Sequence, residues 1–500
     1  MQIKKEKAKF YQYKFEFDFD NDLLGLCREI KDRHGWREFN FSDGAWRFNK
    51  VELAFDIIKK YPQVKLDSAS NASISLYLKE REEIDSIKLS NNKSKYKLRP
   101  YQEEAVKRGV HFYKSGKDGG LIVAPTASGK SIYVASIANE LEGRTIVLQP
   151  SKEILEQNLK KAIEYGFDDI GVFSASCGRK DIGKITFGTI GSVINNKELF
   201  KNFDTAIIDE AHSVRPEKKK QDGSVESSMY NDFIKYFGGR VLGLTATPFR
   251  MHSFIDSLAD ERCVMAKFLT RTRPRIFTKI VHITQISDLY RDGFLCPIDY
   301  EINRDYSQLD IKLNSTGMDF DEESLQVYNK NKKIIPAIEN AIVNNNRKHI
   351  LVFCSSVADA SKLSEDINKI GRTSAIVSAK TPKDKREKIL ENFKNGNISV
   401  VCNCSTMTTG YDFPELDTVI LARPLQSLPL YMQEVGRGIR IAPDKDNVKL
   451  IDLCGNVEKF GKIENFEIVD PGNGLYVLVS GDKQLTGVNL LPEDKRQIYR

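Results

Sequence analysis

Short apolar stretches alternate with helical stretches along most of this 500-residue chain. Such alternation is typical of a parallel sheet with helices on both faces, because the connection between parallel strands needs a crossover. The stretches fall into two blocks, with a pause around residues 270–297. The first block predicts strands at 120–123, 145–148, 205–208 and 241–244, and the second predicts strands at 349–354, 373–377, 398–402 and 418–421. We therefore expect an α/β fold with two parallel-sheet lobes in tandem.

The N-terminal part follows a different pattern. Aromatic and polar residues alternate over residues 11–20, which predicts a half-buried antiparallel strand. Helices are expected at 22–31 and 51–61, on either side of two aromatic runs separated by the turn Ser42-Asp43-Gly44. Residues 84–97 are polar and predict a linker. We expect a small α+β N-terminal domain over 1–90, a first lobe over 91–290, a second lobe over 291–470 and a C-terminal extension over 471–500.

A loop suited to phosphate follows the first predicted strand of the first lobe. Its sequence is Ala124-Pro125-Thr126-Ala127-Ser128-Gly129-Lys130-Ser131, and a helical stretch follows at 132–141. In this position backbone N–H groups and the positive end of the helix dipole face a bound phosphate. We expect Lys130 to reach the β- and γ-phosphates of a nucleotide, and the Ser131 hydroxyl to bind Mg²⁺.

Charged residues from two other stretches are expected at the same site. Asp209 and Glu210 follow the third predicted strand, so they lie at the carboxyl edge of the sheet. Adjacent carboxylates in an extended segment can face a metal and a nucleophile respectively. In the second block, Gln433, Arg437 and Arg440 share one face of a helical stretch. Arginine there would stabilise charge on the phosphoryl group, an effect of about 10³–10⁵ in rate in other nucleotide hydrolases.

Five motifs in one fixed order resemble the ATP engine of superfamily 2 helicases. They are the loop 124–131, Asp209-Glu210-Ala211-His212, Thr245-Ala246-Thr247, Thr408-Thr409-Gly410-Tyr411-Asp412 and the stretch from Gln433 to Arg440. The resemblance covers most of the chain, from residue 97 to residue 440. It implies two RecA-like lobes, ATP and Mg²⁺ as cofactors, Asp209 as a metal ligand and Glu210 as the residue that activates the attacking water. His212 corresponds to the DEAH form of the second motif.

Two further segments complete the nucleotide site that this resemblance implies. Leu98-Arg99-Pro100-Tyr101-Gln102 resembles an adenine-contacting segment, although a helix with Pro in its first turn explains the same sequence. Gly410 and Asp412 resemble the segment that couples the nucleotide to the nucleic acid. The nucleotide-binding residues expected are thus Arg99, Gln102, Pro125, Thr126, Ala127, Ser128, Gly129, Lys130, Ser131, Gly410 and Asp412.

The same resemblance implies a nucleic-acid strand that lies across both lobes and is held mainly through its phosphates. The contacts expected are Pro150, Ser151, Lys152, Gln157, Gly188 and Thr189 in the first lobe, and Ser355, Thr408 and Thr409 in the second. Arg47 is a further candidate in the N-terminal domain, where basic and aromatic residues mix. The alternative for this domain is a packing role, in which its two Trp fill its core.

Composition is compatible with these expectations but does not decide between them. The net charge of +7 suits a polyanion partner and equally a slightly basic enzyme. The eight cysteines include no Cys-x-x-Cys pair, which favours a reduced, cytoplasmic protein. No apolar run is long enough to predict a membrane span.

Together these features predict an ATP-dependent DNA helicase or translocase that remodels forked and four-way junction DNA. The core resembles the UvsW-like branch-migration helicases of phages, and beyond them the RecG and XPB helicases. The expected partner is DNA, with replication or recombination proteins beside it; a phage-encoded protein would act in the host cytoplasm. Three alternatives remain: an RNA helicase, the motor subunit of a restriction complex, and a DNA-binding clamp that uses ATP only as a conformational ligand.

Overall fold

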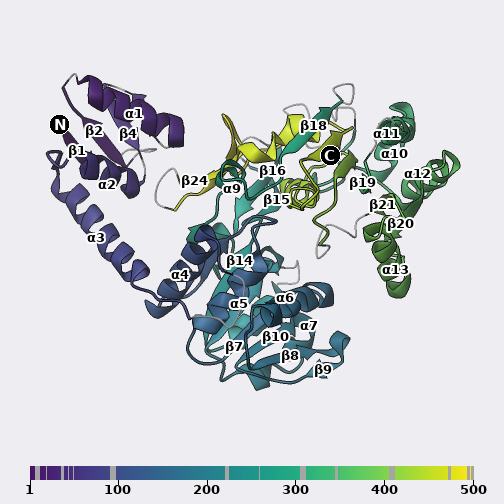
Figure 1. Cartoon of the computed structure of the whole chain (residues 1–500), viewed down its shortest axis with the longest axis horizontal. Helices are drawn as coiled ribbons and strands as arrows, with labels where there is room; N and C mark the ends of the chain where they lie inside the picture. Colours follow the sequence, from purple (N-terminus) through teal and green to yellow (C-terminus); the bar gives the residue numbers. More distant parts are fainter. Residues whose placement is uncertain are drawn as a thin grey trace.

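The computed structural model describes residues 1–5, 12–18, 20–34, 39–42, 44–48, 50–90, 97–219, 225–257, 260–303, 311–343, 347–404, 412–470, 474–491 and 496. A small N-terminal domain is joined by the long helix α3 to a lower lobe, and a second lobe and the C-terminal strands lie above that lobe (Figure 1). Within the described residues, no helix is both long and apolar enough to cross a bilayer.

The lower lobe contains an eight-stranded sheet in the order β17-β6-β14-β11-β7-β10-β8-β9. All neighbouring strands are parallel except β8 and β9. The strands are β6 (Gly120–Val123), β7 (Thr145–Gln149), β8 (Ile170–Ser174), β9 (Arg179–Lys180), β10 (Ile185–Thr189), β11 (Thr205–Asp209), β14 (Arg240–Thr245) and β17 (Lys279–Ile283). The edge strand β17 lies in the region where the sequence pattern pauses.

Helices cover both faces of this sheet. They are α4 (Pro100–Lys114), α5 (Lys130–Glu140), α6 (Lys152–Glu164), α7 (Ile190–Ile194) and α8 (Met229–Tyr236). Alternate residues of β6 show the division, since Ile122 belongs to the core of α4, α5 and α6, whereas Leu121 and Val123 belong to the core that contains α7 and α8. The loops at the carboxyl ends of the strands therefore gather at one edge of the lobe.

The second lobe contains a six-stranded, fully parallel sheet in the order β18-β23-β22-β19-β21-β20. Its strands are β18 (Ile298–Ile302), β19 (Ile350–Cys354), β20 (Ser374–Ser378), β21 (Val400–Cys404), β22 (Thr418–Ala422) and β23 (Val448–Asp452). Its helices are α10 (Glu322–Asn331), α11 (Ile334–Val343), α12 (Val357–Lys369), α13 (Lys383–Lys394), α14 (Leu428–Val435) and α15 (Asn456–Phe460). The expected α/β fold with two parallel sheets is confirmed.

The N-terminal domain has a five-stranded sheet in the order β3-β4-β2-β1-β5. Its elements are β1 (Gln2–Lys5), β2 (Tyr13–Glu16), α1 (Asn21–His34), β3 (Phe39–Ser42), β4 (Ala45–Phe48), α2 (Val51–Lys60), β5 (Lys65–Leu66) and α3 (Ser68–Asp85). Trp46 is buried, and its ring stacks on Phe39 with a centroid distance of 5.1 Å. This Trp therefore fills the core; Trp36 lies outside the described residues.

A long hairpin and the C-terminal segment lie between the two large sheets. The hairpin consists of β15 (Phe249–Asp256) and β16 (Glu261–Phe268), and a small sheet consists of β24 (Phe466–Val469), β25 (Val477–Ser480) and β26 (Lys483–Gln484). Beyond β26, Gly487 N donates to Ala266 O at 2.9 Å and Leu490 N to Val264 O at 2.8 Å. The C-terminal segment thus adds to the edge of the hairpin.

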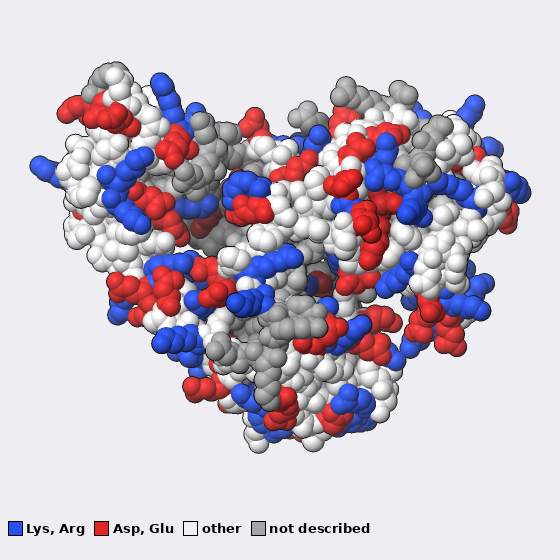
Figure 2. Space-filling model, viewed as in Figure 1, with Lys and Arg blue, Asp and Glu red and all other residues white. Residues whose placement is uncertain are grey.

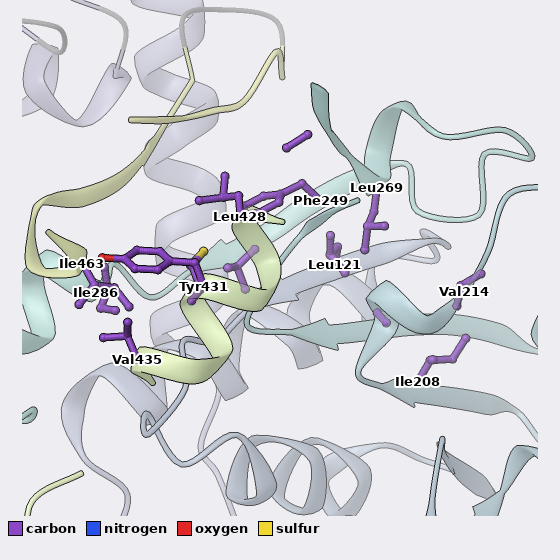
Figure 3. Packing of buried hydrophobic residues seen from close by; sticks show 14 of the residues in the cluster. Leu121, Ile208, Val214, Phe249, Leu269, Ile286, Leu428, Tyr431, Val435 and Ile463 are labelled. Atoms are coloured by element: carbon purple, nitrogen blue, oxygen red, sulfur yellow. The ribbon is translucent and has the colours of Figure 1, made fainter. Parts of the chain in front are cut away.

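One apolar cluster continues from the lower lobe into the second lobe (Figure 3). Helix α14 contributes Leu428 and Tyr431, which lie close to Phe249 and to Ile286 of α9 (Ile286–Arg291), respectively. The Tyr431 hydroxyl donates to Gly461 O at 2.8 Å. Helix α14 ends at Val435, so the expectation that Arg437 and Arg440 share a helical face with Gln433 is wrong, and both arginines lie in the turn and loop that follow. The packing of α14 still sets where they lie relative to the lower lobe.

The close packing of β14 gives a stability prediction for Gly243→Ala. An added Cβ would lie 2.4 Å from Phe277 Cε1 and 2.9 Å from the Cβ of Ala211, and all three residues are in the lower lobe. We expect a loss of about 1–3 kcal/mol, because overpacking forces a buried ring to move. Thermal unfolding checks this, with Gly238→Ala as the matched control, since its Cβ would meet nothing within 4 Å. An unchanged midpoint for Gly243→Ala would contradict it.

Candidate active site

A cleft of about 410 Å³ lies where the lower lobe meets α14 and the segment that follows it. Its walls contain the loop 124–131 and the carboxyl end of β11 from the lower lobe. From the second lobe they contain Asp412 and the residues Gln433, Arg437 and Arg440. On the face of the molecule that Figure 2 shows, acidic and basic side chains are intermixed.

The loop after β6 takes a conformation that opens it toward the cleft. Ala127 and Gly129 have φ of 70° and 86°, in the left-handed region, and α5 begins at Lys130. A Cβ on Gly129 would lie 2.7 Å from Gln102 Nε2, so glycine is required for this close approach. Gln102 Nε2 donates to Ser128 O at 2.9 Å and thereby supports the loop from beneath.

Lys130 forms ion pairs with both carboxylates that follow β11. Its Nζ lies 3.1 Å from Asp209 Oδ1 and also contacts Glu210 Oε1. Burial lowers the pKa of the Lys130 ammonium, but Asp209 and Glu210 outweigh this effect, so that its pKa is raised overall. Burial raises the pKa of Glu210, but the Lys130 ammonium outweighs this effect, so that the pKa of this carboxyl is lowered overall and it is ionised at neutral pH. The site therefore has a fixed cation between two anions.

Asn158 of α6 joins the two oxygen groups that could bind a metal. Ser131 Oγ donates to Asn158 Oδ1 at 2.5 Å, and Asn158 Nδ2 donates to Asp209 Oδ2 at 2.7 Å. Hydroxyl and carboxylate oxygens are the hard ligands that Mg²⁺ prefers alongside nucleotide phosphates, so Ser131 and Asp209 fit this ion. No motif in the sequence pointed to Asn158, which lies beside the predicted contact residue Gln157 on α6.

His212 connects Glu210 to the Thr245-Ala246-Thr247 segment. The His212 Nδ1 atom lies 3.3 Å from Glu210 Oε2 and 2.9 Å from the Thr245 hydroxyl. The Thr247 hydroxyl also lies 3.3 Å from the same nitrogen. Burial lowers the pKa of His212, so the imidazole is neutral in this setting. A movement of Thr245, at the end of β14, would therefore displace His212, which contacts Glu210.

The second lobe contributes a pair of arginines to the cleft. Arg440 Nε lies 2.9 Å from Asp412 Oδ1, and Asp412 Oδ2 accepts from Gln157 Nε2 of the lower lobe at 3.1 Å. Burial, reinforced by the neighbouring Arg440, lowers the pKa of Arg437 to about 9, and burial also lowers the pKa of Arg440. Both guanidinium groups would therefore be stabilised by additional negative charge in the cleft.

Gly436 and Lys445 hold this arginine segment in place. A Cβ on Gly436 would lie 2.9 Å from Thr126 Cβ, so the segment closely approaches the phosphate loop. The Lys445 ammonium donates to Pro414 O at 3.0 Å, Gly438 O at 2.5 Å and Arg440 O at 2.9 Å. The Lys445 ammonium thus joins the segment that begins with Asp412 to the segment that carries Arg437 and Arg440.

The other end of the cleft is aromatic. The Arg99 guanidinium lies 5.0 Å from the ring centroid of Phe294, and the rings of Tyr101 and Phe294 have centroids 5.0 Å apart. Arg99 and Phe294 line the cleft, whereas Gln102 and Ser128 are buried beneath the loop. No motif in the sequence predicted Phe294 at this site, although it lies in the connector between the lobes.

The expected nucleic-acid residues lie in several places. Pro150, Ser151, Lys152, Gly188 and Thr189 all lie at the carboxyl ends of β7 and β10. The Ser151 side chain caps α6, Lys152 pairs with Glu156 at 3.2 Å, and the Thr189 hydroxyl donates to Ser174 at 3.1 Å.

The remaining candidates lie elsewhere. Gln157 lies in the cleft itself, and the Ser355 hydroxyl donates to Ala422 O at 3.4 Å in the second lobe. Arg47 is on β4 of the N-terminal domain, where it bonds to Ser42. Thr408, Thr409 and Gly410 lie outside the described residues.

Two protein families match this chain, one in each lobe. Residues 95–250 match the family described as "Type III restriction enzyme, res subunit", and residues 330–442 match the "Helicase conserved C-terminal domain". A solved fragment from Vibrio vulnificus YJ016, described as an HsdR subunit of a type I restriction enzyme, has the same fold with a TM-score of 0.55. That comparison has 18% sequence identity and covers 90% of this chain and 85% of the fragment.

Two of the relatives are from a fission yeast and an archaeon. The chain is 27% identical over 392 residues to a Schizosaccharomyces pombe protein named as the mitochondrial ATP-dependent helicase irc3. That match covers 73% of this chain but only 58% of the yeast protein. The chain is 25% identical over 382 residues to the DNA 3'-5' translocase XPB2 of Sulfurisphaera tokodaii, which covers 71% and 82% of the two chains. The described chain therefore contains the two-part core of an ATP-dependent superfamily 2 helicase.

Proposed function

We propose that this protein is an ATP-dependent DNA helicase or translocase that remodels forked and junction DNA. The observation that carries the proposal is the cleft in which Lys130, Asp209 and Glu210 face Arg437 and Arg440 of the other lobe. A DNA substrate is supported by the archaeal relative, whose name is DNA 3'-5' translocase. We also propose the finer assignment to DEAH-type, UvsW-like enzymes, which rests on His212 and on the order of the motifs.

In the proposed reaction, Lys130 exchanges its carboxylate partners for the β- and γ-phosphates of ATP. Ser131 and Asp209 would hold Mg²⁺, which supplies charge neutralisation at the phosphates. Glu210, once released from Lys130, orients the attacking water. Arg437 and Arg440 stabilise the charge that spreads over the transferred group. Arg99 and Phe294 flank the adenine at the aromatic end of the cleft.

We propose that the nucleotide state reaches the DNA through two polar connections. One runs from Gln157 through Asp412 to Arg440, with 3.1 Å between Gln157 Nε2 and Asp412 Oδ2 and 2.9 Å between Asp412 Oδ1 and Arg440 Nε. The other runs from Glu210 through His212 to Thr245 and Thr247. The phosphates of the DNA strand would be bound by residues of both lobes, namely Pro150, Ser151, Lys152, Gly188, Thr189, Ser355, Thr408 and Thr409. The domain over 1–90, with Arg47, would recognise the DNA structure.

The motor subunit of a restriction complex is the second candidate. The match of residues 95–250 to a restriction-enzyme family and the fold similarity to an HsdR fragment favour it. In this second proposal the motor would act on unbranched duplex DNA, whereas a fork remodeller needs a branch. The preferred DNA structure therefore separates the two candidates.

The role of Glu210 predicts the behaviour of Glu210→Gln. We expect ATP turnover to fall by about 10²–10⁴-fold, because the amide cannot accept a proton from the water. Nucleotide binding should persist, since the substitution leaves Lys130 and the loop 124–131 unchanged. Steady-state hydrolysis and fluorescent-nucleotide binding check this, with the exposed Glu226→Gln as the matched control. Ordinary turnover by Glu210→Gln would remove Glu210 from the proposed role.

The choice of substrate predicts which nucleic acid stimulates hydrolysis. We expect the largest stimulation from a four-way junction or fork, compared with linear duplex DNA, single-stranded DNA and single-stranded RNA. Lys130→Ala serves as the blank, because it removes the cation that binds the phosphates. Strongest stimulation by long linear duplex would favour the restriction motor, and strongest stimulation by RNA would replace DNA as the substrate.

The contact between Gly436 and Thr126 predicts a specific defect in Gly436→Ala. The added Cβ would lie 2.7 Å from Met432 O and 2.9 Å from Thr126 Cβ, so the segment that carries Arg437 would have to shift within the cleft. We expect kcat to fall about 10-fold or more, since small displacements of catalytic groups have effects of this size. ADP affinity should change little. Gly191→Ala, whose Cβ would meet nothing within 4 Å, is the control. Unchanged kcat for Gly436→Ala would show that the lobes need not approach this closely.

A further inference from the structure

The asparagine that joins Ser131 to Asp209 is itself almost completely buried. Asn158 is 3% exposed, Asp209 is 1% exposed, and the two side chains come from different elements, α6 and β11. Ser131, at the start of α5, is the third residue of this hydrogen-bonded series. The three elements α5, α6 and β11 are thus joined by two short side-chain hydrogen bonds directly below the phosphate loop.

The direction of these hydrogen bonds fixes the orientation of both oxygen ligands. The amide oxygen Asn158 Oδ1 can only accept, so the Ser131 hydroxyl hydrogen points at it. The Ser131 lone pairs are then left for a cation. On the other side, Asn158 Nδ2 donates to Asp209 Oδ2, while Asp209 Oδ1 accepts from Glu210 N at 2.8 Å. The carboxylate plane is therefore held at both oxygens.

We propose that Asn158 is a positioning residue for the Mg²⁺ that accompanies the nucleotide. It presents the Ser131 hydroxyl and the Asp209 carboxylate as a preorganised ligand pair. Groups that orient metal ligands typically change metal affinity by about 10–100-fold when they are removed. This inference rests on the proposed ATP site and deepens it, because it assigns a role to a residue outside the recognised motifs.

Asparagine suits this position better than its near relatives. An aspartate would place a third carboxylate beside Asp209 and Glu210, and like charges in a buried site repel. An alanine would leave the Ser131 hydroxyl free to donate to Asp209 itself, which would turn its hydrogen toward the metal position. A leucine of similar volume would leave both polar groups without their partner.

The test compares the affinity of a fluorescent ADP analogue, mant-ADP, in MgCl₂ and in EDTA. Wild-type protein should bind it more tightly with Mg²⁺. Asn158→Ala and Asn158→Leu should lose about 10-fold or more of this Mg²⁺-dependent gain, with the affinity in EDTA within about 2-fold of wild type. Ser131→Ala should lose the same gain, and the double variant Asn158→Ala, Ser131→Ala should lose little more, because both act on one ligand pair.

Asn231→Ala is the matched control, since Asn231 is also a buried asparagine of the lower lobe and bonds to Arg215 O at 2.8 Å. An equal loss of affinity in MgCl₂ and EDTA for both Asn158 variants would overturn the proposal and leave a purely structural role. An unchanged Mg²⁺-dependent gain would also overturn it. Wild-type protein that binds mant-ADP no better with Mg²⁺ would instead overturn the proposed ATP site itself, and with it the role of Asn158.

Discussion

Lys130 is an ammonium group buried between two carboxylates, and the organisation of the cleft depends on how its charge is balanced. A buried charge without a partner is costly, so the loop after β6 and the end of β11 must stay close together. The sheet makes this possible because β14 lies between β6 and β11 and all three are parallel. In the proposed reaction, phosphates would replace the carboxylates at Lys130, and the charge of Glu210 would then become available for chemistry.

Around Lys130 the lower lobe contributes two carboxylates and one ammonium group to the cleft, whereas the second lobe contributes two guanidinium groups and one carboxylate. Arg437 and Arg440 are held in the cleft by the packing of α14 and by Lys445, which fixes the carbonyls around them. Burial lowers the pKa of both guanidinium groups, so bringing additional anions into the cleft would stabilise them. A nucleoside triphosphate would supply that charge to the arginines and to Lys130 at once. Closure of the lobes can therefore be coupled to the presence of the γ-phosphate through electrostatics alone.

The sequence predicted those parts of the site that follow from strand ends. In a parallel sheet the residues after each strand meet at one edge, so the loop 124–131 and Asp209 could be placed together without any structure. Asn158 and Phe294 could not be found in this way, because one lies inside a helix and the other in a connector, where spacing carries no such constraint. The edge strand β17 was missed for a related reason, since only Ile280 of its five residues is buried and its apolar pattern is weak.

The N-terminal domain shows how burial changes the interpretation of a composition. Mixed aromatic and basic residues suggested a DNA-binding surface, but Trp46 pairs with Phe15 on the face that packs against the helices. Alternate residues of a strand point to opposite faces, so Arg47 lies on the other face, directly opposite Lys14 of β2. Any contact of this sheet with phosphates would then come from basic residues of the polar face, and Trp46 would act only by stabilising the sheet that presents them.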